Sequence, residues 1–183
     1  PKEYEKYIMQ VINGDYELEE RMMVSLFDSE NIYGDALNEV MFRHFAGQGV
    51  GEFKVFVDGC LVGHYSADGI LVAAPTGSTA YCLSAGGPIV NPNCEIIIIQ
   101  PVCPHSLNNR SVIVTAREEI TVSFDAKSTN IYLDGIRVDS RETVLHVKKS
   151  ENTAKFIRLK GYNFYELLFE KIKEPNYFRG GLS

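Results

Sequence analysis

The chain turns from strand to helix in Leu71-Val-Ala-Ala-Pro-Thr-Gly-Ser-Thr-Ala-Tyr-Cys-Leu-Ser-Ala-Gly-Gly-Pro88, a stretch rich in small and hydroxyl-bearing residues. The apolar run 70–74 predicts a strand that ends at Pro75, and residues 80–85 predict a short helix that Gly86-Gly87-Pro88 terminates. Such a turn presents free backbone N–H groups and hydroxyls, which suit an anionic or polyhydroxylated ligand such as a nucleotide. An ordinary strand-to-helix turn, in which Ser and Thr cap the helix, fits the same residues. The spacing alone leaves both interpretations open.

Outside this stretch, short segments alternate apolar and polar residues, which is typical of half-buried strands. Asp58-Gly59 predicts a two-residue hairpin turn, and residues 117–119 predict a second hairpin between their flanking strands. Residues 17–21 are charged and are expected to form a linker. Strands are expected at residues 22–27, 36–45, 53–57, 60–64, 70–74, 96–100, 111–116, 120–124, 130–138 and 144–148. This regular spacing predicts a mainly β chain, folded as a β-sandwich or as strongly bent sheets.

One amphipathic helix is expected near the C-terminus, at residues 163–172. Phe164, Leu167, Leu168 and Ile172 fall on one stripe at helical spacing. Asn163 precedes the stripe and is the expected N-cap.

The composition fits a single domain that spans residues 1–183, because 45% of the 183 residues are hydrophobic. A net charge of −6 argues against a general nucleic-acid-binding or anionic-membrane surface. The longest apolar run, residues 96–99, is too short to cross a bilayer, and no charged-then-apolar leader opens the chain. The four cysteines lack metal-type spacing and are expected to be reduced, mostly buried thiols. We therefore expect a cytoplasmic protein.

Polar residues at three places are candidates for binding. Asn38 and Glu39 are expected in mid-strand, where adjacent side chains face opposite sides. An amide beside a carboxylate can grip a ribose diol, although polar surface residues on an edge strand are the simpler interpretation. Asp68 and Asp134 both precede a glycine, so each is also a plausible turn residue.

The motifs of this chain resemble those of the NAD kinase family, whose members phosphorylate the adenosine ribose 2′-hydroxyl of NAD to make NADP. The resemblance is strongest in Pro75-Thr-Gly-Ser-Thr-Ala-Tyr81 and its continuation Leu83-Ser-Ala-Gly-Gly-Pro-Ile-Val90. It runs from about Tyr16 to the C-terminal helix. Further family landmarks follow in the right order: Glu19-Glu-Arg-Met22, Ala36-Leu-Asn-Glu39, Ser66-Ala-Asp-Gly69, Pro104-His-Ser-Leu-Asn-Asn-Arg110, Leu133-Asp-Gly135 and Phe156-Ile-Arg-Leu-Lys160.

The resemblance implies a β-sandwich-like C-terminal domain of the NAD kinase/diacylglycerol kinase type, with one short helix after the Pro75–Tyr81 motif and a C-terminal helix. The family's Gly-Gly-Asp-Gly loop, on an N-terminal α/β domain, is absent from this sequence, and its Asp is the expected general base and metal contact. We therefore expect this chain to be the C-terminal domain alone. Its C-terminal helix would pack either on its own β domain or on that N-terminal domain.

The resemblance implies no catalytic or metal-binding residue in this chain, but it assigns substrate binding to Asn38, Glu39, Asp68, Thr76, Thr79, Ala80, Tyr81 and Ser84. Asn38 and Glu39 would hold the adenosine ribose, and Asp68 would accept from the nicotinamide carboxamide. The residues from Thr76 to Ser84 would line the adenine and ribose pocket. This chain departs from many relatives at Ala73-Ala74, where they carry Ser or Thr.

A second group of residues is implied less directly: His105, Leu107, Arg110 and Asp134. The segment that contains His105 and Arg110 reaches a neighbouring subunit in the family. Many relatives have Gln after the motif that contains Asp134, where this chain has Ile136, so recognition by that side chain is in doubt.

The expected reaction is phosphoryl transfer from ATP or polyphosphate with Mg²⁺, in a homodimer or homotetramer that binds neither nucleic acid nor membrane. The isolated chain would be inactive. Two alternatives are a lipid kinase of the diacylglycerol or sphingosine type and a non-catalytic nucleotide-binding assembly module. The former would favour an apolar or basic membrane-facing patch, and the sequence indicates neither.

Overall fold

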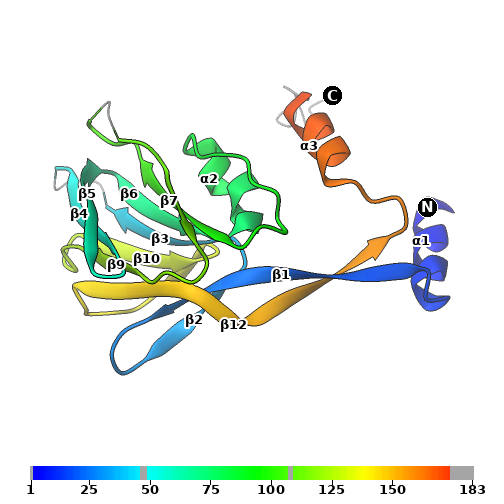
Figure 1. The fold of residues 1–183 in the computed structure, drawn as a ribbon, viewed down its shortest axis with the longest axis horizontal. Coiled ribbons are helices and arrows are strands. Elements are labelled where there is room, and N and C mark those ends of the chain that lie inside the picture. Colours follow the sequence, from blue (N-terminus) through cyan, green and yellow to red (C-terminus); the bar gives the residue numbers. More distant parts are fainter. Residues whose placement is uncertain (1, 46–48, 107–108, 174–183) are drawn as a thin grey trace, which may run out of the picture. The chain divides into compact units, whose positions relative to one another are not determined.

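The computed structural model describes residues 2–45, 49–106 and 109–173 (Figure 1). Their contacts separate two compact units. The larger unit is formed by residues 20–154. The smaller one is formed by the described residues up to 19 and from 155 onward.

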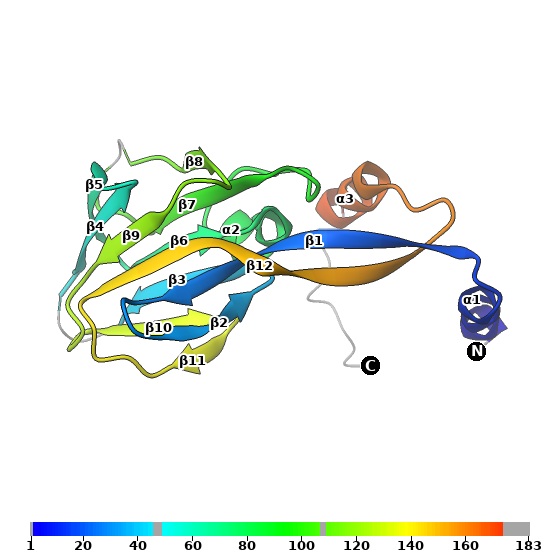
Figure 2. The same cartoon turned by 60° about the horizontal axis from the view of Figure 1, so that its bottom comes forward.

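The described strands form two six-stranded sheets, ordered β2-β1-β12-β9-β4-β5 and β11-β10-β3-β6-β7-β8 (Figures 1 and 2). In the larger unit their inner faces pack together, with Phe53 and Val122 from the first sheet against Phe42 and Ile99 from the second, all fully buried. The strands are β1 (Tyr16–Phe27), β2 (Ile32–Ala36), β3 (Glu39–His44), β4 (Gly51–Val57), β5 (Cys60–Ala67), β6 (Gly69–Ala73), β7 (Ile96–Val102), β8 (Val112–Thr115), β9 (Ile120–Ser123), β10 (Thr129–Leu133), β11 (Ile136–Val138) and β12 (Val144–Leu159). The prediction of a mainly β, sandwich-like fold is confirmed.

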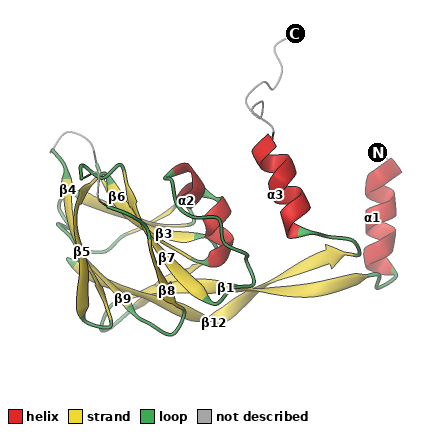
Figure 3. Ribbon diagram, turned by 45° about the horizontal axis from the view of Figure 1, so that its top comes forward, coloured by secondary structure: helices red, strands yellow, loops and turns green. Residues whose placement is uncertain are grey.

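A short helical segment covers the outer face of the second sheet (Figure 3). It consists of the 3₁₀-helix η1 (Pro75–Thr79) and the helix α2 (Tyr81–Ser84), at the place where a turn and a short helix were expected. Cys82 of α2 is buried against Ala73 and Ile98. A neighbouring apolar cluster on the same face joins Met41, Leu71 and Val102 with Ala85 and Tyr132.

The prediction that residues 117–119 close a hairpin is wrong. β8 pairs with β7 in the second sheet, whereas β9 pairs with β4 and β12 in the first. A tight turn does occur, since Glu118 N–H donates to Thr115 O at 3.2 Å, but the two strands then diverge. Alternation of apolar residues shows which face of a strand is buried, but it does not show which sheet the strand joins. Both sheets have an apolar inner face, so the pattern is the same in either one.

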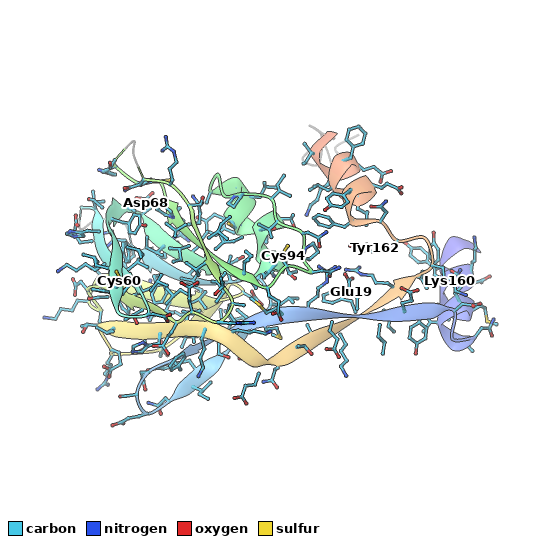
Figure 4. The ribbon with its side chains drawn as sticks, in the orientation of Figure 1. Glu19, Cys60, Asp68, Cys94, Lys160 and Tyr162 are labelled. Carbon is cyan, nitrogen blue, oxygen red and sulfur yellow. The ribbon has the colours of Figure 1, made fainter. Side chains whose placement is uncertain are left out.

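The prediction that residues 17–21 form a linker is also wrong, because β1 begins at Tyr16. Arg158 on β12 pairs with Glu19. Its guanidinium carbon Cζ also lies over two aromatic rings, 5.0 Å from the ring centroid of Phe156 and 4.0 Å from that of Tyr162. Lys160, labelled in Figure 4, lies with its Nζ 3.2 Å from Asp15 Oδ1. Cross-strand pairing therefore accommodates the charged residues in a strand.

Two helices belong to the smaller unit. α3 (Phe164–Lys173) confirms the predicted C-terminal helix, and its N-cap is Asn163, whose Oδ1 accepts from Tyr165 N–H at 2.9 Å. α1 (Lys2–Ile12) was not predicted.

The expectation of mostly buried thiols is wrong. Cys82 is buried, but Cys60, Cys94 and Cys103 are exposed, and all four are unbridged. Figure 4 labels Cys60 and Cys94.

Candidate functional site

A bend at residues 37–38 separates β2, which was not predicted, from β3, so the expected strand 36–45 begins only at Glu39. The Asp134 carboxylate causes the bend by accepting three successive backbone N–H groups: Leu37 at 2.7 Å, Asn38 at 2.8 Å and Glu39 at 3.0 Å. Three parallel donors cannot converge on one carboxylate from a flat strand, whose successive N–H groups point in opposite directions. The prediction that Asn38 and Glu39 lie in mid-strand is therefore wrong: Asn38 lies in the bend and Glu39 begins β3.

Asp134 is also the turn residue that its Asp-Gly pair predicted. It joins β10 to β11 with φ +47°, and Gly135 follows at +82°. Its own N–H donates to Glu39 O at 3.1 Å. The turn thus directs the Asp134 carboxylate toward the bend. Asp134 is therefore both the turn residue and a residue that shapes the site.

The bend is held from its other side by the strand that leads into η1. Asn38 O accepts from Ala74 N–H at 2.8 Å. A side chain at Gly77 would place its Cβ 2.1 Å from Asn38 O, so only glycine permits this approach. The two conspicuous sequence motifs, at residues 36–39 and 75–81, therefore meet backbone to backbone.

Two buried polar atoms beside this junction have no hydrogen-bond partner among the described residues: Glu39 Oε2 and Thr76 Oγ1. Glu39 is only 9% exposed. Burial raises the pKa of its carboxyl group to about 7, and the negative charge of Asp134 adds to the effect. Buried polar groups are nearly always hydrogen-bonded, so these two retain capacity for a ligand.

The hydroxyl groups of η1 are not equivalent. Ser78 is fully buried, and its Oγ bridges the N–H and carbonyl of Val90, both at 3.2 Å, so it supports the fold. Thr79 Oγ1 lies 3.4 Å from Thr76 O, while Tyr81 and Ser84 are exposed. Ala80, at φ −99° and ψ −132°, separates η1 from α2.

A cavity of about 460 Å³ brings Asp68 and Tyr81 together. Met41, which also lines it, lies on the face of β3 opposite the core residue Phe42, so the cavity opens on the outer side of the second sheet. Other lining residues are Arg43, Cys103 and Tyr132.

Asp68 occupies a corner rather than a tight turn (Figure 4). There the chain leaves β5 in the first sheet and enters β6 in the second. The Asp68 N–H donates to Val102 O at 3.0 Å, and its carbonyl accepts from His44 N–H at 2.9 Å. These two bonds fix the backbone of Asp68 between β3 and β7.

His105 and Arg110, from the second group of predicted residues, are not among the described residues that line this cavity. His105 is exposed, and its N–H donates to Ser66 O at 2.9 Å. Arg110 is exposed, with Nη1 3.0 Å from Asn109 O. Leu107 lies outside the described residues. Their part in a subunit contact stays a prediction.

Sequence reasoning missed Gln100, a buried side chain that supports α2. Its Nε2 donates to Ala85 O at 2.9 Å, at the C-terminal end of α2, and to Pro101 O at 2.8 Å. Its Oε1 accepts from Ser111 Oγ. The sequence signal for Gln100 was its position directly after the isoleucine run 96–99, because an amide buried at the end of such a run needs hydrogen-bond partners.

Within the described residues, no group of three or more His, Cys, Asp or Glu side chains is placed to hold a metal ion. None of the described helices combines the length and apolar character needed to span a membrane.

The family model for the ATP-NAD kinase C-terminal domain matches residues 37–159, which include the bend, η1, the cavity and Asp134. The chain is 38% identical over 174 residues to an NAD kinase of Caldanaerobacter subterraneus subsp. tengcongensis, covering 90% of this chain and 61% of that protein. It is 40% identical over 173 residues to an NAD kinase of Caldicellulosiruptor bescii, covering 93% and 66%. The chain thus spans about three fifths of the length of these relatives.

Two solved structures resemble the fold. Yeast NADH kinase complexed with NADH superposes with a TM-score of 0.84 at 25% identity, covering 99% of this chain and 56% of that one. An NAD kinase from Archaeoglobus fulgidus in complex with ATP gives 0.79 at 28% identity, covering 92% and 65%. By the family model, the relatives and the fold together, this chain belongs to the NAD kinase family.

Proposed function

We propose that this chain is the substrate-binding part of a longer NAD kinase, which transfers a phosphoryl group to the adenosine ribose 2′-hydroxyl of NAD. The observation that carries the proposal is the doubly held bend. Asp134 on one side and Ala74 with Gly77 on the other fix Asn38 and Glu39 beside η1. Phosphoryl transfer depends largely on positioning, and this arrangement holds its polar pair by contacts on both sides.

In this proposal Asn38 and Glu39 hold the acceptor ribose. Glu39 Oε2 is buried without a partner and can take a ribose hydroxyl. Because burial raises the pKa of Glu39 to about 7, its carboxyl group can either accept or donate near neutral pH. Thr76 Oγ1 supplies a second free polar atom beside the same junction.

The cavity on the outer face would take the rest of the dinucleotide. Asp68 offers a carboxylate to the nicotinamide amide group, and the half-exposed ring of Tyr81 offers a flat surface for packing. NADH in the yeast relative and ATP in the archaeal one are compatible with a dinucleotide acceptor and a nucleotide donor.

The phosphoryl donor, which we propose to be ATP or polyphosphate, would bring Mg²⁺ with it. The described residues do not form a site that fits this ion, so we assign no magnesium ligand to this chain and derive no step through the ion. The general base is proposed to come from the part of the relatives that this chain does not cover. We also propose a homodimer or homotetramer, in which the segment around His105 and Arg110 reaches the neighbouring subunit.

Purified full-length protein tests the proposal directly. Incubated with NAD, ATP and MgCl₂, it should form NADP, measured with an NADP-specific dehydrogenase, and polyphosphate should be tried in place of ATP. The 183-residue chain alone should be inactive. Phosphorylation of diacylglycerol or sphingosine in place of NAD would refute the proposal in favour of a lipid kinase. Binding of NAD without turnover by the full-length protein would favour a nucleotide-binding module.

A further inference from the structure

The residues assigned to NAD binding leave the charge of the ligand unbalanced. The eight include two carboxylates, Glu39 and Asp68, and no lysine or arginine. Asp134 adds a third carboxylate beside Glu39. The diphosphate of a dinucleotide carries two further negative charges. Glu39 is buried, whereas Asp68 and Asp134 are exposed. Bringing the diphosphate close to three carboxylates is unfavourable unless a cation lies nearby.

Arg43 is the only lysine or arginine among the described residues that line the cavity of Asp68 and Tyr81. It lies on β3, four residues after Glu39 and two after Met41, and therefore on the same outer face of the sheet. In the cross-strand register Arg43 stands between Asn130 of β10 and Gly69 of β6.

The Arg43 guanidinium makes no hydrogen bond, ion pair or ring contact with any described residue. The Arg43 side chain is exposed. Gly69, its register neighbour on β6, has no side chain that could cover it, and a Cβ there would meet Phe42 O at 2.4 Å. The other charged or titratable groups that line the cavity are Asp68, His44, Tyr81, Tyr132 and Cys103. A guanidinium that lines a cavity and has no partner among the described residues is suited to bidentate binding of a phosphate.

We propose that Arg43 binds the diphosphate of the dinucleotide acceptor and so sets the affinity for NAD. The inference rests on the proposed NAD kinase activity and adds to it the residue that recognises the charged link between the two nucleotides. Because this contact forms with the acceptor and not with the transferred group, it should act on the KM for NAD and leave the KM for ATP unchanged.

The test compares Arg43→Gln and Arg43→Lys in the full-length kinase. Arg137→Gln is the matched control, because Arg137 is also an exposed arginine of the second sheet and pairs only with Asp139 at 3.5 Å among the described residues. Arg43→Gln should raise the KM for NAD roughly 10- to 100-fold, with kcat and the KM for ATP within about twofold of wild type. Arg43→Lys keeps the charge without the planar fork and should be intermediate. Melting temperatures confirm folding.

Truncated ligands separate charge recognition from cavity shape. Arg43→Gln should weaken inhibition by ADP-ribose, which keeps the diphosphate, and leave inhibition by adenosine unchanged. A folded Arg43→Gln variant with the wild-type KM for NAD would overturn the inference, as would an equal loss in Arg137→Gln or a loss confined to ATP. Absence of NADP formation by the wild-type kinase would instead refute the proposed function, and the inference with it.

Discussion

Replacement of Asp134 by alanine should release the bend that presents Asn38 and Glu39. The carboxylate accepts N–H groups from Leu37, Asn38 and Glu39 at 2.7, 2.8 and 3.0 Å. No other acceptor for these three donors is in place in the described structure once the carboxylate is gone. We therefore expect the bend to relax, with loss of the junction between β3 and η1.

The magnitude follows from the exposure of these bonds. A hydrogen bond to a charged group contributes about 1.5–3 kcal/mol when it is shielded from water. The bonds from Leu37 and Asn38 are open to solvent and only that from Glu39 is partly buried, so water replaces part of the loss. Alanine at φ +47° adds about 1 kcal/mol. The total is roughly 2–4 kcal/mol, which lowers the melting temperature of a chain of this size by about 4–16 °C.

Asp58 supplies the matched control. It occupies the same kind of Asp-Gly turn at φ +46°, but among the described residues its carboxylate accepts a single N–H, from Glu119 at 2.9 Å. Asp58→Ala therefore shares the backbone cost and should leave NAD kinetics of the full-length enzyme unchanged. Asp134→Ala should lower kcat/KM for NAD by roughly 100-fold or more. Equal melting shifts in the two variants, together with unchanged NAD kinetics in Asp134→Ala, would refute the reasoning.

Three further predictions concern the same site. The folded-state pKa of Glu39 is raised from 4.5 to about 7, so the folded state loses stability as pH rises through this range and Glu39 ionises. Glu39→Gln should therefore be more stable than wild type above pH 7. Denaturant titrations should show the difference in free energy of unfolding between the two proteins shrinking toward pH 4.5. Gly77→Ala should abolish NAD use because its Cβ would collide with Asn38 O. Gly86→Ala strains the backbone at φ +83°, but its Cβ would have no atom within 4 Å, so this variant should retain activity in the same assay. Asp68→Asn should weaken NAD binding by calorimetry with an unchanged melting temperature; the reverse pattern would make Asp68 a purely structural corner residue.

The positions of most strands were predictable from the sequence, but β2, the first part of β1 and the assignment of strands to sheets were not. Periodicity identified the apolar faces of β8 and β9 correctly, as the burial of Val114 and Val122 shows. It could not reveal that the two strands pair with β7 and β4 in different sheets. Pairing depends on contacts far apart in sequence, whereas periodicity is a local property. The Asp58-Gly59 hairpin was predictable because its turn chemistry is itself local.

The candidate site shows the same division between contact residues and the residues that hold them. The resemblance of the motifs assigned Asn38, Glu39 and the η1 segment to the site separately. Nothing in the sequence of residues 36–39 predicts a bend. The bend exists because Asp134, 95 residues beyond Glu39, turns its carboxylate onto three backbone donors. An Asp-Gly turn adopts the same local geometry whatever its side chain contacts: φ is +47° at Asp134, with three distant N–H donors, and +46° at Asp58, with the single N–H of Glu119. The same Asp-Gly pair therefore forms one turn whose carboxylate accepts a single distant N–H and another whose carboxylate accepts three and so shapes a site. The difference lies in which backbone segment is within reach of the carboxylate, and that is a tertiary property.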